Sequence, residues 1–181
     1  MRWNGFARSL LFAALAAGAF PIFALFANPV VGRASALSLY LLGIAAVYVA
    51  GLAPRRSRAV VTAGIASALG AGVFLLAPSV GTVAAGAALV VGVCRSGVLY
   101  RSRRARALAA ETILLGGGLG LARFLAGPDT LHIAFAIWGF FLVQSFFFLV
   151  GGIAERVEAT AGLDPFEVAR ARALALMEGE V

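Results

Sequence analysis

The chain has 181 residues, of which 62% are hydrophobic and 13% are charged, and its formal net charge is +7. Soluble domains carry about 25% charged residues, so the composition excludes an ordinary soluble fold and predicts an all-α, polytopic membrane protein. The fifteen basic residues are spread between apolar blocks instead of forming one basic patch, which argues against nucleic-acid binding.

The first apolar block follows Arg8 and predicts a membrane span over about residues 9–27. A basic start before an apolar run is also typical of a cleaved signal peptide. The uncharged run continues to Gly32, however, which favours a helix that is retained. A turn containing Asn28 and Pro29 is then expected, followed by a second span over about 34–52.

The middle of the chain contains 36 uncharged residues, from Ala59 to Cys94. One helix of that length would extend about 54 Å at 1.5 Å per residue, far beyond a hydrocarbon core of about 30 Å. Pro78 disfavours a continuous helix, and Ser79 is a suitable N-cap. The sequence therefore predicts two spans, about 60–76 and 80–94, joined by a tight turn over 77–81.

Two further blocks predict spans over about 107–126 and 131–152, which completes a six-span domain over 1–153. With this topology thirteen arginines fall on one side, and only Arg33 and Arg123 fall on the other. Basic residues mark the cytoplasmic side, so we expect both termini in the cytoplasm of a bacterial-type inner membrane. A single cysteine, Cys94, permits no intrachain disulfide.

The six spans pair into three hairpins that suggest a threefold internal repeat. The turn prolines, Pro29, Pro78 and Pro128, are 49 and 50 residues apart, and arginine clusters precede the third and fifth spans. The alternative is that any series of short membrane hairpins places proline in its turns and arginine on its cytoplasmic side.

Few ionisable or polar residues lie inside the predicted spans, and such residues are the default functional candidates in a membrane protein. Glu111 is either an interfacial carboxylate paired with arginine or a proton or cation site. Gln144 and Ser145 lie in the sixth span, where polar side chains usually bond to neighbouring helices. Together the three are candidates for a polar or ion site.

Arg123, Asp129 and His132 are candidates for a polar cluster on the outer face. Ordinary interfacial caps are the alternative. One histidine and one carboxylate are too few ligands for a typical metal site. We therefore expect no metal and no cofactor.

Small residues at helical spacing predict close helix packing. They are Gly116 and Gly120 in the fifth span, and Ala66, Gly70 and Gly72 in the third. Glycine that lines a narrow pore is the alternative.

The sixth span is rich in aromatic residues, which face lipid or a partner or line a site for an apolar molecule such as a lipid tail, a quinone or a pigment. They are Phe135, Trp138, Phe140, Phe141, Phe146, Phe147 and Phe148.

The hydrophilic tail, 154–181, contains an amphipathic helix predicted over about 165–178. Asp164 and Pro165 suit its first turn. Its apolar face needs a surface to dock on and consists of Phe166, Ala169, Ala173, Leu176 and Met177.

No nucleotide-binding signature, activated nucleophile or carboxylate pair is visible, so we expect a protein that is not an enzyme. Two function classes fit. The first is a structural or accessory subunit that binds copies of itself or other membrane proteins, with the C-terminal helix as docking element. The second is a small transporter or channel for an ion or small solute. A transporter should expose Glu111, Gln144 or Arg123 to a water-filled cavity, whereas a scaffold should bury them in helix contacts.

Overall fold

The computed structural model describes residues 5–53, 56–77, 79–95, 104–148 and 170. These residues form helices and no strand: α1 (Gly5–Val31), α2 (Arg33–Leu52), α3 (Arg56–Leu76), α4 (Val80–Val93), α5 (Arg104–Leu125), α6 (Thr130–Ser145) and the 3-10 turn η2 (Phe146–Phe148). The chain divides into two compact units, 1–150 and 151–181. The predicted tail helix falls in the second unit and lies outside the described residues, except for Arg170.

Among the described residues, four segments are long and apolar enough to cross a membrane: α1, α2, residues Ser57–Leu76 of α3, and α6 with η2. Helix α4 is apolar but shorter, with 14 residues. Large apolar side chains are exposed around the bundle; Leu75, Leu76 and Phe124 are each more than four-fifths accessible. A surface of this kind suits lipid and not water, so the helices indicate membrane insertion.

The long uncharged run is divided as predicted. Helix α3 ends at Leu76 and α4 begins at Val80. The Ser79 hydroxyl accepts a hydrogen bond from the Thr82 backbone N–H at 3.3 Å, and the Thr82 hydroxyl accepts one from the Ser79 N–H at 3.1 Å. This reciprocal capping box satisfies two backbone donors that a helix start leaves open.

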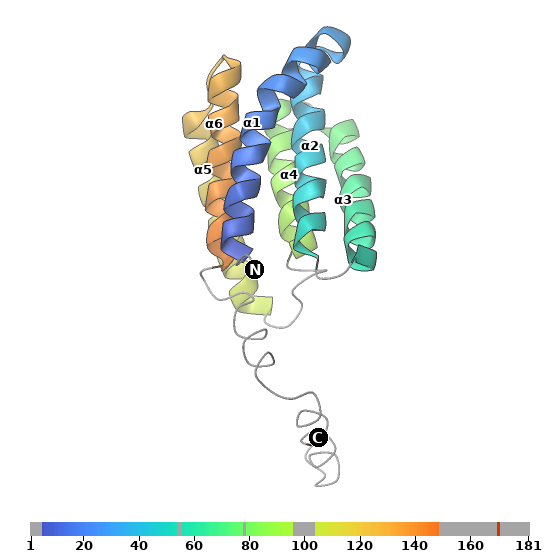
Figure 1. The fold of residues 1–181 in the computed structure, drawn as a ribbon, viewed down its shortest axis with the longest axis vertical. Helices are drawn as coiled ribbons and strands as arrows, with labels where there is room; N and C mark the ends of the chain where they lie inside the picture. The colour runs from blue at the N-terminus through green and yellow to red at the C-terminus, as the bar shows by residue number, and fades with distance from the viewer. Residues whose placement is uncertain (1–4, 54–55, 78, 96–103, 149–169, 171–181) are drawn as a thin grey trace. The chain divides into compact units, whose positions relative to one another are not determined.

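The first turn differs from the prediction. Pro29 does not lie in a turn but inside α1, which continues to Val31. Proline already has a helical φ and forfeits one backbone hydrogen bond, so the helix runs on to Gly32, whose φ of +78° reverses the chain at little cost for glycine. Pro21 also lies inside α1, and the bend of this helix in Figure 1 is of the kind that proline causes.

Helices α1 to α6 alternate in direction (Figure 1). We call the end that holds the turns at Gly32, Ser79 and 126–129 the Asp129 end, and the opposite end, where α4 finishes, the Arg95 end. Each helix packs on its neighbour in the chain, and α6 returns to α1.

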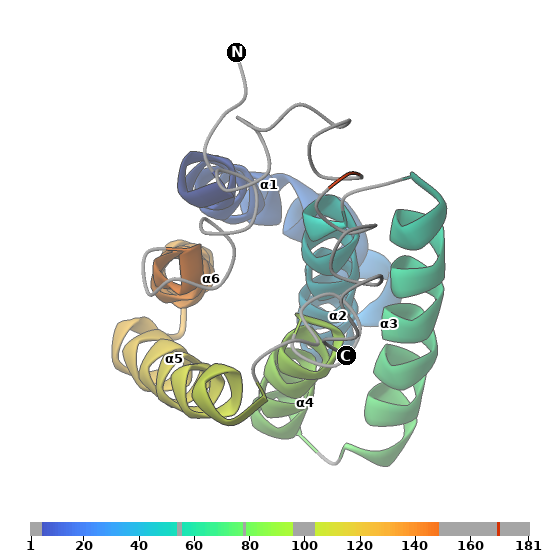
Figure 2. The same cartoon turned by 90° about the horizontal axis from the view of Figure 1, so that it is seen from below.

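Helix α2 also packs on α4, which leaves α3 outside the other five helices (Figure 2). A threefold repeat would place a similar contact between α4 and α6 and between α6 and α2. Among the described residues, neither pair makes a contact of that extent. The threefold repeat therefore stays a prediction.

Candidate functional site: a buried ionic cluster and an apolar chamber

A buried ion pair joins α4 and α5 at the Arg95 end. Cys94 and Arg95 extend α4 by a π-helical turn, and Glu111 lies two turns into α5. The Arg95 guanidinium donates to both carboxylate oxygens, from Nη2 to Oε1 at 2.7 Å and from Nε to Oε2 at 3.0 Å. The two side chains are 0% and 6% exposed. This two-bond fork is the strongest geometry that arginine and a carboxylate form.

Gln144 of α6 completes what we call the Arg95 cluster (Arg95, Glu111 and Gln144). Arg95 Nη2 donates to Gln144 Oε1 at 2.8 Å, and Nη1 donates to the Gln144 main-chain oxygen at 3.4 Å. Gln144 Nε2 in turn donates to the Leu114 carbonyl of α5 at 3.0 Å. The guanidinium carbon lies 4.1 Å from the centre of the Phe147 ring, which adds a cation–π contact. The cluster thus ties α4, α5 and α6 together.

Two glycines allow these helices to approach closely enough for the cluster to form. A β-carbon at Gly92 would lie 2.9 Å from Leu115 Cδ1 and 3.2 Å from Glu111 Oε1. A β-carbon at Gly118 would lie 3.0 Å from Gln144 Nε2. A side chain at either position would therefore press on Glu111 or Gln144, the partners of Arg95.

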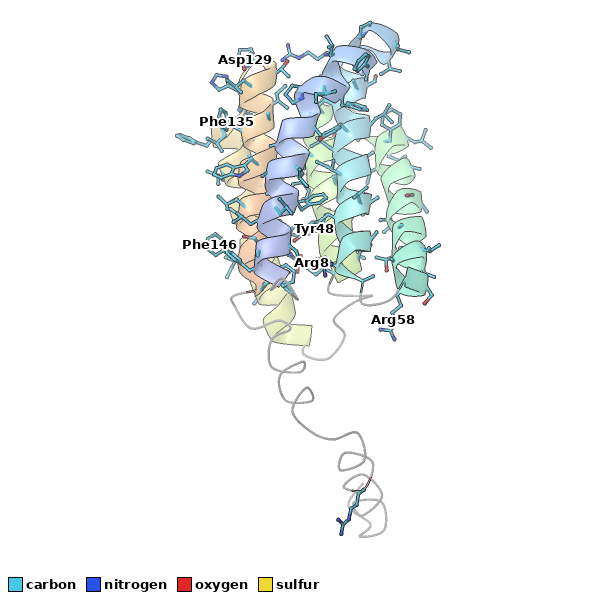
Figure 3. The ribbon with its side chains drawn as sticks, in the orientation of Figure 1. Arg8, Tyr48, Arg58, Asp129, Phe135 and Phe146 are labelled. Carbon is cyan, nitrogen blue, oxygen red and sulfur yellow. The ribbon has the colours of Figure 1, made fainter. Side chains whose placement is uncertain are left out.

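A second polar contact lies beside the cluster, between α1 and α2. The hydroxyls of Ser9 and Tyr48 are 3.0 Å apart and buried, and Tyr48 is close enough to Arg95 for the two to interact electrostatically. A cavity of about 440 Å³ lies next to them and is lined partly by Arg8, Ser9 and Tyr48. Figure 3 shows Arg8 and Tyr48 toward the end of the bundle opposite Asp129.

Every buried side-chain nitrogen and oxygen of the Arg95 cluster has a hydrogen-bond partner. The net charge of the pair is zero, both carboxylate oxygens accept hydrogen bonds, and no buried side-chain nitrogen or oxygen in the described part of the chain lacks a partner. Such an arrangement fixes α4, α5 and α6 relative to one another. It leaves neither charged group of the pair accessible from outside. It resembles the interfacial carboxylate–arginine pair expected for Glu111, but it is fully enclosed.

At the Asp129 end, two of the three predicted outer residues come together. Asp129 caps α6: its Oδ1 accepts from the His132 backbone N–H at 2.8 Å, and its Oδ2 lies 2.6 Å from His132 Nδ1. Both side chains are more than half exposed. The hydrogen bonds from the His132 backbone and ring lower the pKa of the Asp129 carboxyl below its usual value. Within the part of the chain described, Arg123 makes no ion pair with Asp129.

Arg123 instead lines an apolar chamber of about 400 Å³. We use this name for the cavity that α2, α4, α5 and α6 line, whose walls include Ala45, Ala84, Val91 and Phe141. Phe140 and Phe141 of the aromatic sixth helix face this chamber, whereas Phe135 points away from the bundle (Figure 3) and the ring of Phe146 lies 6.3 Å from that of Phe6 in α1.

The predicted packing residues divide between two environments. Ala66 is buried, and Gly70 of α3 faces Leu42 of α2, to which a β-carbon would lie 3.5 Å. At Gly72, Gly116 and Gly120 a β-carbon would meet nothing within 4 Å. The last two therefore pack on no helix of the described part of this chain; the close approach in α5 is made by Gly118. Ser145 is buried and donates to the Leu142 carbonyl at 2.6 Å, which leaves it outside the Arg95 cluster.

Sequence reasoning missed Arg95: the fourth span was predicted to end at about residue 94, and Arg95 was counted among the thirteen arginines on the cytoplasmic side. The available signal was its position: Arg95 directly follows the apolar run Leu89–Cys94, with no turn residue between them. An arginine at that place is still on the helix, and a lone carboxylate in the next span is its natural partner. Tyr48 and Ser9 carried no comparable signal.

Comparisons of the chain with protein-family models, with curated proteins and with solved structures found no match.

Proposed function

We propose that this chain is a non-enzymatic integral membrane protein that acts as a structural or accessory subunit, in a homo-oligomer or a larger membrane complex. The observation that carries the proposal is the closed Arg95 cluster: Glu111 and Gln144 are 5% and 0% exposed and are engaged in helix–helix contacts. Six spans, cytoplasmic termini in a bacterial-type inner membrane, and docking through the C-terminal helix belong to the same proposal.

An open face of α5 supports assembly. Gly116 and Gly120 are exposed, and Ile113 and Phe124 on the same helix are 73% and 85% exposed. Glycines four residues apart let a second membrane helix approach closely. The structure of the single chain leaves this face uncovered, as expected for a subunit.

The test is native mass spectrometry of the protein purified in mild detergent. A defined oligomer or a co-purifying protein at fixed stoichiometry supports the proposal. Gly116→Leu with Gly120→Leu should dissolve a homo-oligomer, whereas Gly64→Leu, at another exposed glycine with open space around it, should not. Loss of a protein partner on truncation after Gly162 would assign docking to the tail. A monomer without any partner would contradict the proposal.

The orientation is tested separately by cysteine labelling. In a Cys94→Ser background, single cysteines at Arg58 and Asp129 should react differently with a membrane-impermeant maleimide applied to intact cells. We expect labelling at position 129 and protection at position 58. The reverse pattern would contradict cytoplasmic termini.

A transporter or channel is the second candidate, and the apolar chamber favours it because Arg123 lies in its wall. The assay is solute or ion flux into liposomes that contain the purified protein. Flux that is lost in Arg123→Gln and kept in Arg58→Gln would favour this candidate over the subunit.

A further inference from the structure

Among the described residues that line the apolar chamber, the charged side chain is positive. Its lining comes from α2, α4, α5 and α6 and is hydrocarbon except for Arg123, and among the described residues no acidic side chain contributes to it. Arg123 lies in the last turn of α5, at the Asp129 end, and its side chain is exposed. A long arginine at that level can hold its charge at the membrane surface while its stem follows the apolar wall. The site is therefore complementary to an anion attached to an apolar chain.

The depth of the chamber corresponds to half a membrane. Its lining on α4 extends from Val80 to Val91, which is about 16 Å at 1.5 Å per residue. Half of a hydrocarbon core of about 30 Å is about 15 Å. The deep end is formed by Val91 and Phe141, close to Arg95 and Gln144 in the chain. This depth suits an acyl chain of one leaflet.

The chamber is accessible from the side. Helix α5 packs extensively on α6 and only lightly on α4, and the residues that α4 and α5 contribute near the Asp129 end, such as Ala84 and Ala122, are only partly covered. Apolar cavities do not hold water well, and at about 400 Å³ this one has the size of a ligand site. In a bilayer, lipid chains are the apolar molecules present at this opening.

We propose that the chamber is a binding site for an anionic phospholipid, with one acyl chain between α4 and α6 and the phosphate beside Arg123. The proposal requires membrane insertion but neither the subunit role nor transport, so the native-mass and flux experiments above can fail without affecting it. A neutral phospholipid has the same chains but lacks the net negative charge that Arg123 would recognise.

The experiment is native mass spectrometry of delipidated protein with added palmitoyl-oleoyl phosphatidylglycerol, phosphatidylcholine of the same chains, or free oleate. We expect one phosphatidylglycerol per chain, bound about fivefold more tightly than phosphatidylcholine, since one arginine near the surface contributes about that factor. Arg123→Gln should remove this preference, and the matched Arg58→Gln, at the Arg95 end, should keep it. Ala84→Phe, which fills the chamber, should abolish retention of both phospholipids.

A second readout does not depend on any variant. Phosphatidylglycerol with a diazirine near the end of one acyl chain should label peptides of α4 and α6 around Val91 and Phe141. Labelling confined to the outer surface of α3, equal binding in wild type and both Arg123→Gln and Ala84→Phe, or preferential retention of oleate would each overturn the proposal.

Discussion

The Arg95 cluster makes a sharp prediction about stability. Replacing Glu111 by alanine leaves a guanidinium that is 0% exposed and has lost its only carboxylate partner among the described residues. Because both groups are buried, solvent screening does not reduce the effect. Removing one partner of a buried ion pair costs about 3–5 kcal/mol, and we expect Glu111→Ala to lower the free energy of unfolding by that amount.

A double variant separates the pair from its surroundings. In Arg95→Met/Glu111→Leu both charges are gone, and the remaining cost is that of the Gln144 side-chain oxygen Oε1 left without its donor, about 1–3 kcal/mol for a buried polar group. The double variant should therefore be more stable than Glu111→Ala. Arg95→Met alone should be milder than Glu111→Ala, because a lone carboxyl group can take up a proton and become neutral, whereas a guanidinium keeps its charge.

The assay is reversible unfolding in mixed micelles by titration with sodium dodecyl sulfate, followed by circular dichroism. Arg58→Gln is the matched control, since Arg58 is exposed at the same end, and its effect should stay within about 0.5 kcal/mol. A loss below about 1 kcal/mol for Glu111→Ala, or additive single-variant losses in the double variant, would refute the reasoning that the pair is buried and coupled.

Three further predictions concern local packing and capping. Gly86→Ala should cost about 1–3 kcal/mol in the same unfolding assay, because its β-carbon would lie 2.4 Å from a valine methyl of α3. Gly72→Ala, where a β-carbon meets nothing within 4 Å, should be neutral or stabilising. Equal effects of the two variants would contradict the close contact between α3 and α4. Ser79→Ala should cost about 1 kcal/mol through loss of the α4 N-cap, and an unchanged unfolding midpoint would exclude that role. The pKa of Asp129 is lower in the folded chain than its usual 3.8. The stabilisation from its contact with His132 is therefore complete above about pH 3.8 and is lost as the pH falls through the lower pKa of the folded chain. A pH series of unfolding free energies should show this loss at acid pH in wild type and not in Asp129→Asn.

Most of the helical organisation could be predicted from the sequence because it follows from local chemistry. The division of the run over 59–94 depended on helix length, on Pro78 and on the capping ability of Ser79, all of which are readable in a few residues. Pro29 misled because proline is compatible with the last turns of a helix, and the choice between turn and helix was made by Gly32, three residues later.

The candidate site was less predictable because it depends on contacts between distant residues. Arg95 and Gln144 are 49 positions apart and meet only because the α5–α6 hairpin returns to α4. Spacing pointed to Gly116 and Gly120 as packing residues of α5, but it could not tell that Gly118 faces α6 while Gly116 and Gly120 face outward. That distinction depends on the rotation of the helix about its axis, which is set by tertiary packing.

The position of Arg95 also has a consequence for synthesis. Its partners are made after it, Glu111 16 residues later and Gln144 49 residues later. Until the last hairpin is inserted, the fourth helix ends in a charge that the membrane interior disfavours. We expect chains that stop after α4 to be degraded rapidly in a pulse-chase experiment, and Arg95→Met to prolong their lifetime. Arg95 thus stabilises the complete bundle and destabilises a chain whose last hairpin is missing.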